Sequence, residues 1–215
     1  MAEQQIKSKQ RVAERGEVFT AEREVNAMLD LVRQETERID SRFLEPACGT
    51  GNFLVEILRR KLRLVRNDCE MVQAVSSIYG IDIMQDNVEE CRQRLLGIVL
   101  NHYGSIQGEL LDSVRFILVR NILWGDALTL REPVPDNATQ AEKNRAPSIT
   151  FSEWCFIADM VKRKDYHLSA LLQAQSTPVN DLFSDLGEEA YLAPTPVKEY
   201  KPVHYLKVYA TEQPL

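Results

Sequence analysis

The sequence predicts an α/β fold with a mostly parallel sheet and helices on both faces. Two observations support this prediction. Short apolar, β-branched runs alternate with segments of helical periodicity along residues 21–170. The first of these runs breaks into a glycine-rich turn, and later ones end in Asp82 and Asp126. Ligands of open parallel sheets bind beyond the carboxyl ends of the strands, so we expect the functional site there.

The composition is that of an ordinary globular chain. Of its 215 residues, 44% are hydrophobic and 27% are charged, and the net charge is −6. This charge lowers the expectation of nucleic-acid binding without excluding a local basic patch. The four cysteines and three histidines lack metal-ligand spacing, and no run of 18 apolar residues or apolar leader occurs. We therefore expect reduced cysteines, no metal, no membrane span and a cytoplasmic location.

The first elements follow from local patterns. Residues 1–20 are predicted to be a polar N-terminal segment. Apolar residues from Val25 to Val32 recur with helical spacing, which predicts a helix from residue 21 to about residue 39 with Thr20 as its N-cap. Residues 42–44 form a short predicted strand.

A second helix follows the glycine-rich turn, and Asn52 is its expected N-cap. Apolar residues from Phe53 to Leu62 provide its core face. The opposite face is basic from Arg59 to Arg66, which indicates either a solvated surface or a contact with nucleic acid or a partner. Residues 162–164 are the other short basic stretch.

Three further strands complete the expected sheet. "AVSSIYGIDI" predicts a strand ending at Asp82, with a helix after it, and "VRFILVRNILWGDAL" predicts a strand ending near Asp126. After a loop, "SITFSEWCFIADMV" predicts a fourth strand leading into a helix through about Val161. Residues 171–215 are expected to be a loop-rich tail, so that the domain covers residues 21–170 and its sheet is incomplete at the C-terminal end.

The turn "FLEPACGTGNF", residues 43–53, has the features of a ligand-binding turn. Gly49 and Gly51 permit a sharp bend and a close approach of backbone to ligand. Acids at the ends of the second and third strands suit the hydroxyls of a ribose and the amine of an adenine. Leu54 breaks the dinucleotide-binding pattern, no P-loop is present, and Glu45 would repel a pyrophosphate. These features favour S-adenosylmethionine, which carries a sulfonium and an ammonium group.

Four segments in this order, "GEVFT", "FLEPACGTGNF", "IYGIDI" and "NILWGDAL", resemble the adenine-specific DNA methyltransferases of restriction–modification systems. The resemblance covers roughly residues 16–130. It implies the class I S-adenosylmethionine-dependent methyltransferase fold, which is Rossmann-like, and methyl transfer to N6 of adenine in DNA. It also implies that the matching positions bind the cofactor: Phe19, Thr20, Glu45, Pro46, Ala47, Cys48, Gly49, Gly51, Asn52, Phe53, Asp82, Ile83, Asp126 and Ala127.

Within this set the resemblance implies distinct roles. The turn would wrap the amino acid end of the cofactor, and Phe19 would lie over the methionine part. Asp82 would bind the ribose, Ile83 would pack on the adenine, and Asp126 would meet the polar edge of the adenine. Phe19 and Ile83 also fit ordinary core positions. Ala21 departs from the family, which usually has proline there.

The family's catalytic signature, an Asn or Asp followed by Pro-Pro and an aromatic, has no match in the chain. Phe151, Ser152, Glu153 and Trp154 stand at the expected place. Ser152 or Glu153 could accept a hydrogen bond from the target amine, and Trp154 could stack on a flipped base, which makes these three the candidate catalytic residues. Trp154 also fits a core or interface position.

Two functions remain open at this point. The first is a DNA adenine-N6 methyltransferase that works alone or with a specificity or restriction subunit. The second is a catalytically impaired S-adenosylmethionine-binding module that acts as a regulatory or assembly subunit. The ordered set of motifs favours the first, which is the leading hypothesis, whereas the missing Pro-Pro pair and the missing target-recognition domain are the reasons for the second. Transfer to a small molecule or a protein is a third option that the acidic charge permits.

Overall fold

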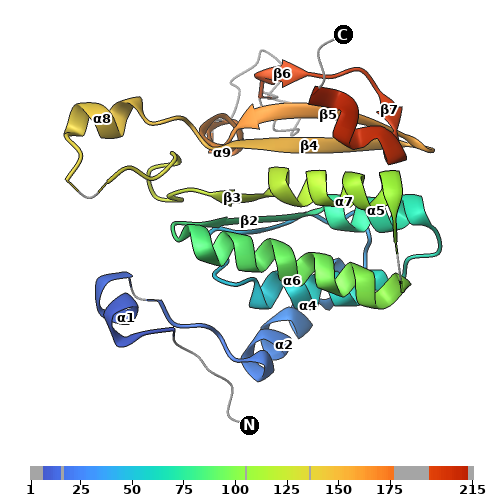
Figure 1. Cartoon of the computed structure of the whole chain (residues 1–215), viewed down its shortest axis with the longest axis horizontal. Coiled ribbons are helices and arrows are strands. Elements are labelled where there is room, and N and C mark those ends of the chain that lie inside the picture. The colour runs from blue at the N-terminus through green and yellow to red at the C-terminus, as the bar shows by residue number, and fades with distance from the viewer. Residues whose placement is uncertain (1–6, 16, 105, 136, 177–193, 213–215) are drawn as a thin grey trace, which may run out of the picture.

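The computed structural model of the chain describes residues 7–15, 17–104, 106–135, 137–176 and 194–212. Three parallel strands form one sheet, and a second sheet is built on two long antiparallel strands. The second sheet lies on one side of the parallel sheet, and helices cover the other side (Figure 1). The expected α/β fold with a parallel sheet is therefore confirmed for three strands, and it is compatible with a Rossmann-like fold.

The parallel sheet has the order β1-β2-β3, and its strands are β1 Phe43–Glu45, β2 Ile78–Asp82 and β3 Ile122–Trp124. The central strand β2 is buried along its whole length. Because the strands run in the same direction, their carboxyl ends meet at one edge of the sheet. Glu45 and Asp82 lie at this edge, as predicted.

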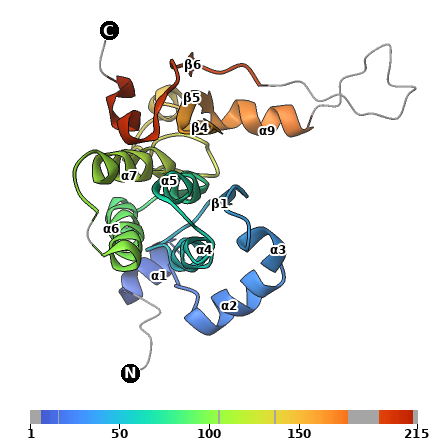
Figure 2. The same ribbon diagram turned by 90° about the vertical axis from the view of Figure 1, so that its right-hand side faces the viewer.

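Helices connect these strands: α4 Asn52–Leu62, α5 Asp68–Ser76, α6 Gln85–Tyr103 and α7 Gly108–Asn121. Helices α4 and α6 pack on one side of the sheet, and α5 and α7 lie toward the second sheet (Figures 1 and 2). The predicted strand "VRFILVR" is wrong, since it is the second half of α7. Its apolar residues Val114, Ile117 and Leu118 fall on one buried helical face. Asn67 caps α5, a helix that the sequence pattern did not predict, and accepts from the Glu70 backbone N–H at 2.9 Å.

The N-terminal part contains α1 Lys9–Arg15, α2 Glu22–Asp30 and α3 Arg33–Thr36. The helix predicted from residue 21 to about residue 39 is therefore interrupted after Asp30. Val25 and Leu29 form its buried face, as the spacing indicated. The N-cap of α2 is Ala21, not Thr20, and it makes no side-chain capping bond.

The second sheet joins β4 Thr150–Ile157 to β5 Met160–His167 in an antiparallel hairpin, and β5 also pairs with the short strands β6 Lys198–Glu199 and β7 Val203–His204. The prediction of a fourth parallel strand followed by a helix is therefore wrong. The remaining elements are α8 Gln140–Arg145, α9 Leu168–Ser176 and the 3₁₀ segment η2 Tyr205–Glu212. Residues 177–193 and 213–215 of the predicted loop-rich tail lie outside the described residues.

One buried amide joins the two sheets. Asn121, the last residue of α7, donates through Nδ2 to the backbone carbonyls of Ser76 at 2.9 Å and Ile78 at 3.0 Å. Its Oδ1 accepts from Trp154 Nε1 of β4 at 2.9 Å. Because all of these groups are removed from water, each bond is costly to lose. Asn121 therefore fixes β4 against the amino end of β2.

Lys61 is a second buried polar joint. Its ammonium donates to the backbone carbonyls of Ile39 at 3.2 Å and of Ser41, and to Ser77 Oγ at 2.6 Å. These contacts hold the segment before β1 against α4 and the start of β2. Burial lowers the pKa of Lys61 to about 7, because the charged form loses its hydration.

This pKa predicts a pH dependence of stability. The unfolded chain keeps Lys61 protonated up to its ordinary pKa of 10.5, so between pH 7 and 10.5 the unfolded state binds more protons than the folded state. The free energy of unfolding attributable to Lys61 therefore rises with pH across this window. We expect the difference in unfolding free energy between wild type and Lys61→Met to shift in favour of wild type from pH 7 to pH 10, measured by urea denaturation. A constant difference would contradict the assignment.

Candidate functional site

A cavity of about 690 Å³ opens at the carboxyl ends of the three parallel strands. Its walls come from the segment before α2, the turn after β1, the end of β2 with the start of α6, and the residues after β3. This size lies in the range of small-molecule sites, about 300–1,000 Å³. The cavity is therefore at the place where an open parallel sheet is expected to bind its ligand.

The structure brings together the predicted cofactor-binding positions in this one cavity. The predicted residues that line it are Phe19, Thr20, Glu45, Pro46, Ala47, Cys48, Gly49, Asn52, Phe53, Asp82, Ile83, Asp126 and Ala127. Gly51 is buried and does not line the cavity. The residues that line the cavity without having been predicted are Glu17, Val18, Met84, Asn87, Gly125 and Leu128. Four of these directly adjoin predicted positions in the sequence, and Glu17 and Asn87 are the exceptions.

The glycines of the turn have separate structural reasons. Gly49 has φ 53° and Gly51 has φ 88°, which are left-handed values that favour glycine. A Cβ on Gly49 would come within 3.0 Å of the Phe19 ring, so the turn and the N-terminal segment are in close contact. A Cβ on Gly51 would lie 2.5 Å from Cys91 Sγ of α6. Gly51, not the predicted Asn52, is the N-cap of α4.

Asp82 connects the elements around the cavity. Its Oδ2 accepts the Gly49 backbone N–H at 2.8 Å, and its Oδ1 accepts the Met84 backbone N–H at 2.8 Å and Asn87 Nδ2 at 3.3 Å. An ionised carboxylate offers about four acceptor positions. Protein donors fill three of them, which leaves room for one ligand hydroxyl rather than the two that the sequence suggested.

The charged side chains that line the cavity are all acidic. Glu17, Glu45, Asp82 and Asp126 are all acidic, and the described lining includes no Lys, Arg or His. Burial raises the pKa of the Glu45 carboxyl. A cationic ligand is attracted to such a lining, and a phosphate or pyrophosphate is repelled.

The far side of the cavity has an apolar rim. Trp124 Nε1 donates to the Ile83 carbonyl at 2.9 Å, which fixes the segment after β2 beside the end of β3. Ile83 is 37% exposed and lines the cavity, so it is not a core residue. Asp126 Oδ1 accepts the Leu128 backbone N–H at 2.8 Å, which closes the turn after β3. An exposed apolar side chain beside a fixed carboxylate suits a planar ring with a polar edge.

The predicted catalytic segment does not reach the cavity. Ser152 is buried, and its Oγ donates to Asp165 Oδ1 at 2.7 Å. Trp154 is 5% exposed and donates to Asn121, and Glu153 forms an ion pair with Arg42 at 2.8 Å. These candidate catalytic residues therefore lie away from the cavity, and Trp154 takes the core position that its sequence also fitted. Pairing with β5 places them in the second sheet, where Ser152 and Trp154 are packing residues.

The two basic stretches are largely neutralised by acids. Arg60 pairs with Asp30 at 2.9 Å and with Glu56 at 3.3 Å. Lys162 pairs with Glu199 at 2.7 Å. Ion pairs of this kind support the interpretation of both stretches as ordinary surface.

The described residues contain no group of three or more His, Cys, Asp or Glu side chains arranged to hold a metal ion. Within the same residues, no helix is long and apolar enough to cross a membrane. Comparison of the chain with protein-family models, with curated proteins and with solved structures gave no match.

Because the turn packs closely against α6, we expect alanine substitutions at two glycines to change the unfolding free energy in opposite directions. Gly51→Ala must adopt a left-handed φ and displace Cys91, so we expect a loss of about 2–4 kcal/mol in unfolding free energy. Gly97→Ala lies in the interior of α6, where the added Cβ would meet no atom within 4 Å beyond the neighbouring backbone of the helix, and it should stabilise by about 0.5–1 kcal/mol. Urea denaturation measures both. Equal effects at the two sites would contradict the described packing.

Proposed function

We propose that the cavity binds S-adenosylmethionine and that the chain is the cofactor-binding component of a DNA adenine-N6 methyltransferase of restriction–modification type. The observation that carries this proposal is the acidic, phosphate-repelling lining at the carboxyl ends of the three parallel strands. Dinucleotides and nucleoside triphosphates carry phosphates that such a lining disfavours. S-adenosylmethionine combines an adenosine with two cationic groups, so it matches both the position and the charge of the cavity.

Individual residues suit separate parts of this cofactor. Glu45 would attract the ammonium group, and the Phe19 ring would cover the methionine part. Asp82 would accept one ribose hydroxyl at its remaining position, while Ile83 packs on the adenine and Asp126 accepts from its amine. Bound S-adenosylmethionine would supply an electrophilic methyl group. The residues of this chain hold and orient the donor and keep phosphate ligands out.

Methyl transfer by this chain alone is not supported. The positions that the resemblance assigns to catalysis are committed to the second sheet, and Trp154 is hydrogen-bonded to Asn121 there. We therefore propose that the groups that position the target adenine come from a partner chain. The same observation favours a second candidate, in which the chain is a regulatory or assembly subunit that binds the cofactor without transferring its methyl group.

Calorimetric titration tests cofactor binding. We expect S-adenosylmethionine and S-adenosylhomocysteine to bind, and ATP and NAD to bind at least tenfold more weakly. Because the ammonium group pairs with the ionised form of Glu45, affinity should fall as the pH drops through the raised pKa of this carboxyl, by up to about tenfold per pH unit. Glu45→Gln should bind more weakly at pH 7 and lose this dependence, whereas Asp112→Asn, on the exposed surface of α7, should behave as wild type. If neither S-adenosylmethionine nor S-adenosylhomocysteine binds, the proposal is refuted.

A transfer assay separates the two candidate functions. We expect the purified chain to incorporate no methyl groups into mixed-sequence DNA, and the chain combined with the products of neighbouring genes to do so. Asp126→Ala should then lower incorporation together with cofactor affinity. The chain alone could still incorporate methyl groups. If Trp154→Phe then abolished this incorporation without changing the stability of the protein, residue 154 would be catalytic. No incorporation in any combination would favour the regulatory subunit.

A further inference from the structure

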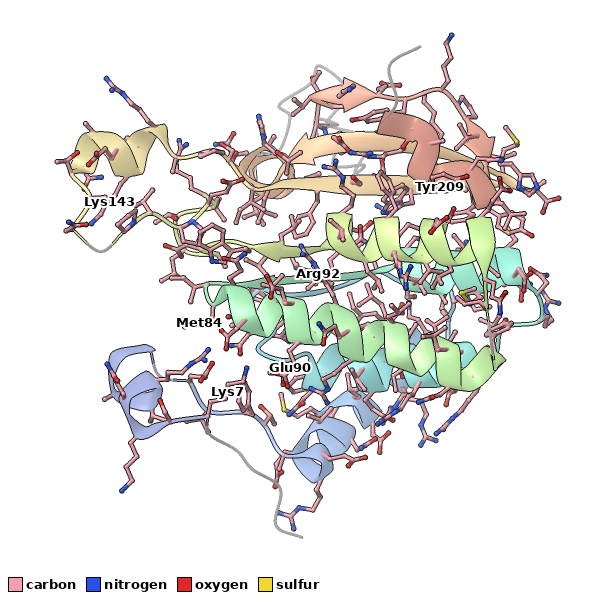
Figure 3. The ribbon with its side chains drawn as sticks, in the orientation of Figure 1. Lys7, Met84, Glu90, Arg92, Lys143 and Tyr209 are labelled. Atoms are coloured by element: carbon pink, nitrogen blue, oxygen red, sulfur yellow. The ribbon has the colours of Figure 1, made fainter. Side chains whose placement is uncertain are left out.

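An N-terminal lid, defined here as residues 7–15 and 17–20, lies against the cavity. Glu17 to Thr20 form part of the cavity wall, and Thr20 is held by a hydrogen bond from Asn52 Nδ2 to its carbonyl at 2.8 Å. Figure 3 shows Lys7 of the N-terminal segment beside α6 and near Glu90. The lid is thus attached both at the turn after β1 and at the start of α6.

Ion pairs attach α1 to the first turns of α6. Arg11 binds Asp86 through two nitrogens, at 2.7 Å and 3.0 Å. Lys7 Nζ lies 2.8 Å from Glu90 Oε2 and 3.2 Å from Asp86 Oδ2. The hydrogen bonds from Arg11 hold the pKa of Asp86 well below its usual range, so the carboxylate stays charged at neutral pH. Because these pairs are partly exposed, each contributes little and is weakened by salt.

Asn87 connects this attachment to the cavity. Its Nδ2 donates to Glu17 Oε1 at 2.7 Å and to Asp82 Oδ1 at 3.3 Å, and its Oδ1 accepts from Lys7 Nζ at 2.8 Å. The side chain is 1% exposed, so these bonds do not exchange freely with water. A single amide therefore contacts the lid, the ion-pair network and the acid at the end of β2.

We propose that Asn87 is a positioning residue that couples closure of the N-terminal lid to occupancy of Asp82. This inference rests on the proposed function. Asn87 Nδ2 has two hydrogens and donates one to Glu17 and one to Asp82, so a closed lid holds the Asp82 carboxylate in the orientation in which its remaining position, on Oδ2, accepts a ligand hydroxyl. A closed lid thus strengthens ligand binding, and by thermodynamic reciprocity ligand binding stabilises the closed lid. The ion pairs of Lys7 and Arg11 set how often the lid opens and this orientation of Asp82 is lost.

Hydrogen exchange in the ligand-free protein tests the lid without relying on cofactor binding. We expect Asp86→Asn to raise the exchange rates of the α1 amides by about two- to fivefold, the effect of losing a partly exposed ion pair. Salt at 0.5 M should produce a similar increase in wild type and little further increase in the variant. Glu89→Gln, an equal charge change on the exposed side of α6, should leave these amides unchanged. If the α1 amides exchange at equal rates in Asp86→Asn and Glu89→Gln, the proposal that the Asp86 ion pairs hold the lid is overturned.

Dissociation of S-adenosylhomocysteine, followed by stopped flow, tests the coupling. Asp86→Asn should accelerate dissociation by about two- to fivefold, and Glu89→Gln should not. In an Asn87→Ala background, Asp86→Asn should have no further effect, because the path from the lid to Asp82 is already broken. If Asp86→Asn accelerates dissociation by the same factor in the Asn87→Ala background as in wild type, the proposed role of Asn87 is overturned. If wild type binds no S-adenosylhomocysteine, the proposed function and the coupling both fail, and the exchange experiment still decides whether the lid exists.

Discussion

The carboxylate of Asp82 is the interaction on which the rest of the site depends. It stands at the end of β2, which is buried along its whole length, so its position is set by the core. From there it holds the turn after β1 through Gly49, the start of α6 through Met84 and the N-terminal lid through Asn87. A largely buried carboxylate is stable only when donors surround it, and here those donors are the walls of the cavity.

The two sheets have different structural roles. The parallel sheet brings its carboxyl ends, with their acids, to the cavity, whereas the second sheet provides cover for α5 and α7. The buried polar residues of β4 and β5 bind one another inside the second sheet. Arg163 is buried, and its guanidinium binds Asp165, which also accepts from Ser152. In the proposed function, holding a cofactor and acting on a second substrate are therefore separable, and we propose that this chain provides the first.

The sequence predicted best where chemistry is local. The turn after β1 and the acid that ends β2 were predicted because glycine, proline and carboxylate at short spacing permit few arrangements. The α7 segment was mistaken for a strand because β-branched composition outweighed its helical period, and β3 is only three residues long. The β4–β5 hairpin depends on pairing between strands, which periodicity along one strand does not reveal. Asn87 was missed because its partners, Glu17 and Lys7, lie 70 and 80 residues away.

The joint between Asn121 and Trp154 limits how this protein could be re-engineered. Writing an Asn-Pro-Pro-aromatic motif over residues 151–154 would insert prolines into a strand that pairs with β5 along its length. With Phe at position 154 it would also remove the partner of an amide whose other bonds fix the carbonyls of Ser76 and Ile78 at the base of β2. The loosened strand would be the one that carries Asp82. Under the proposed function, restoring a catalytic motif by editing β4 would therefore disturb the strand whose acid is proposed to bind the cofactor.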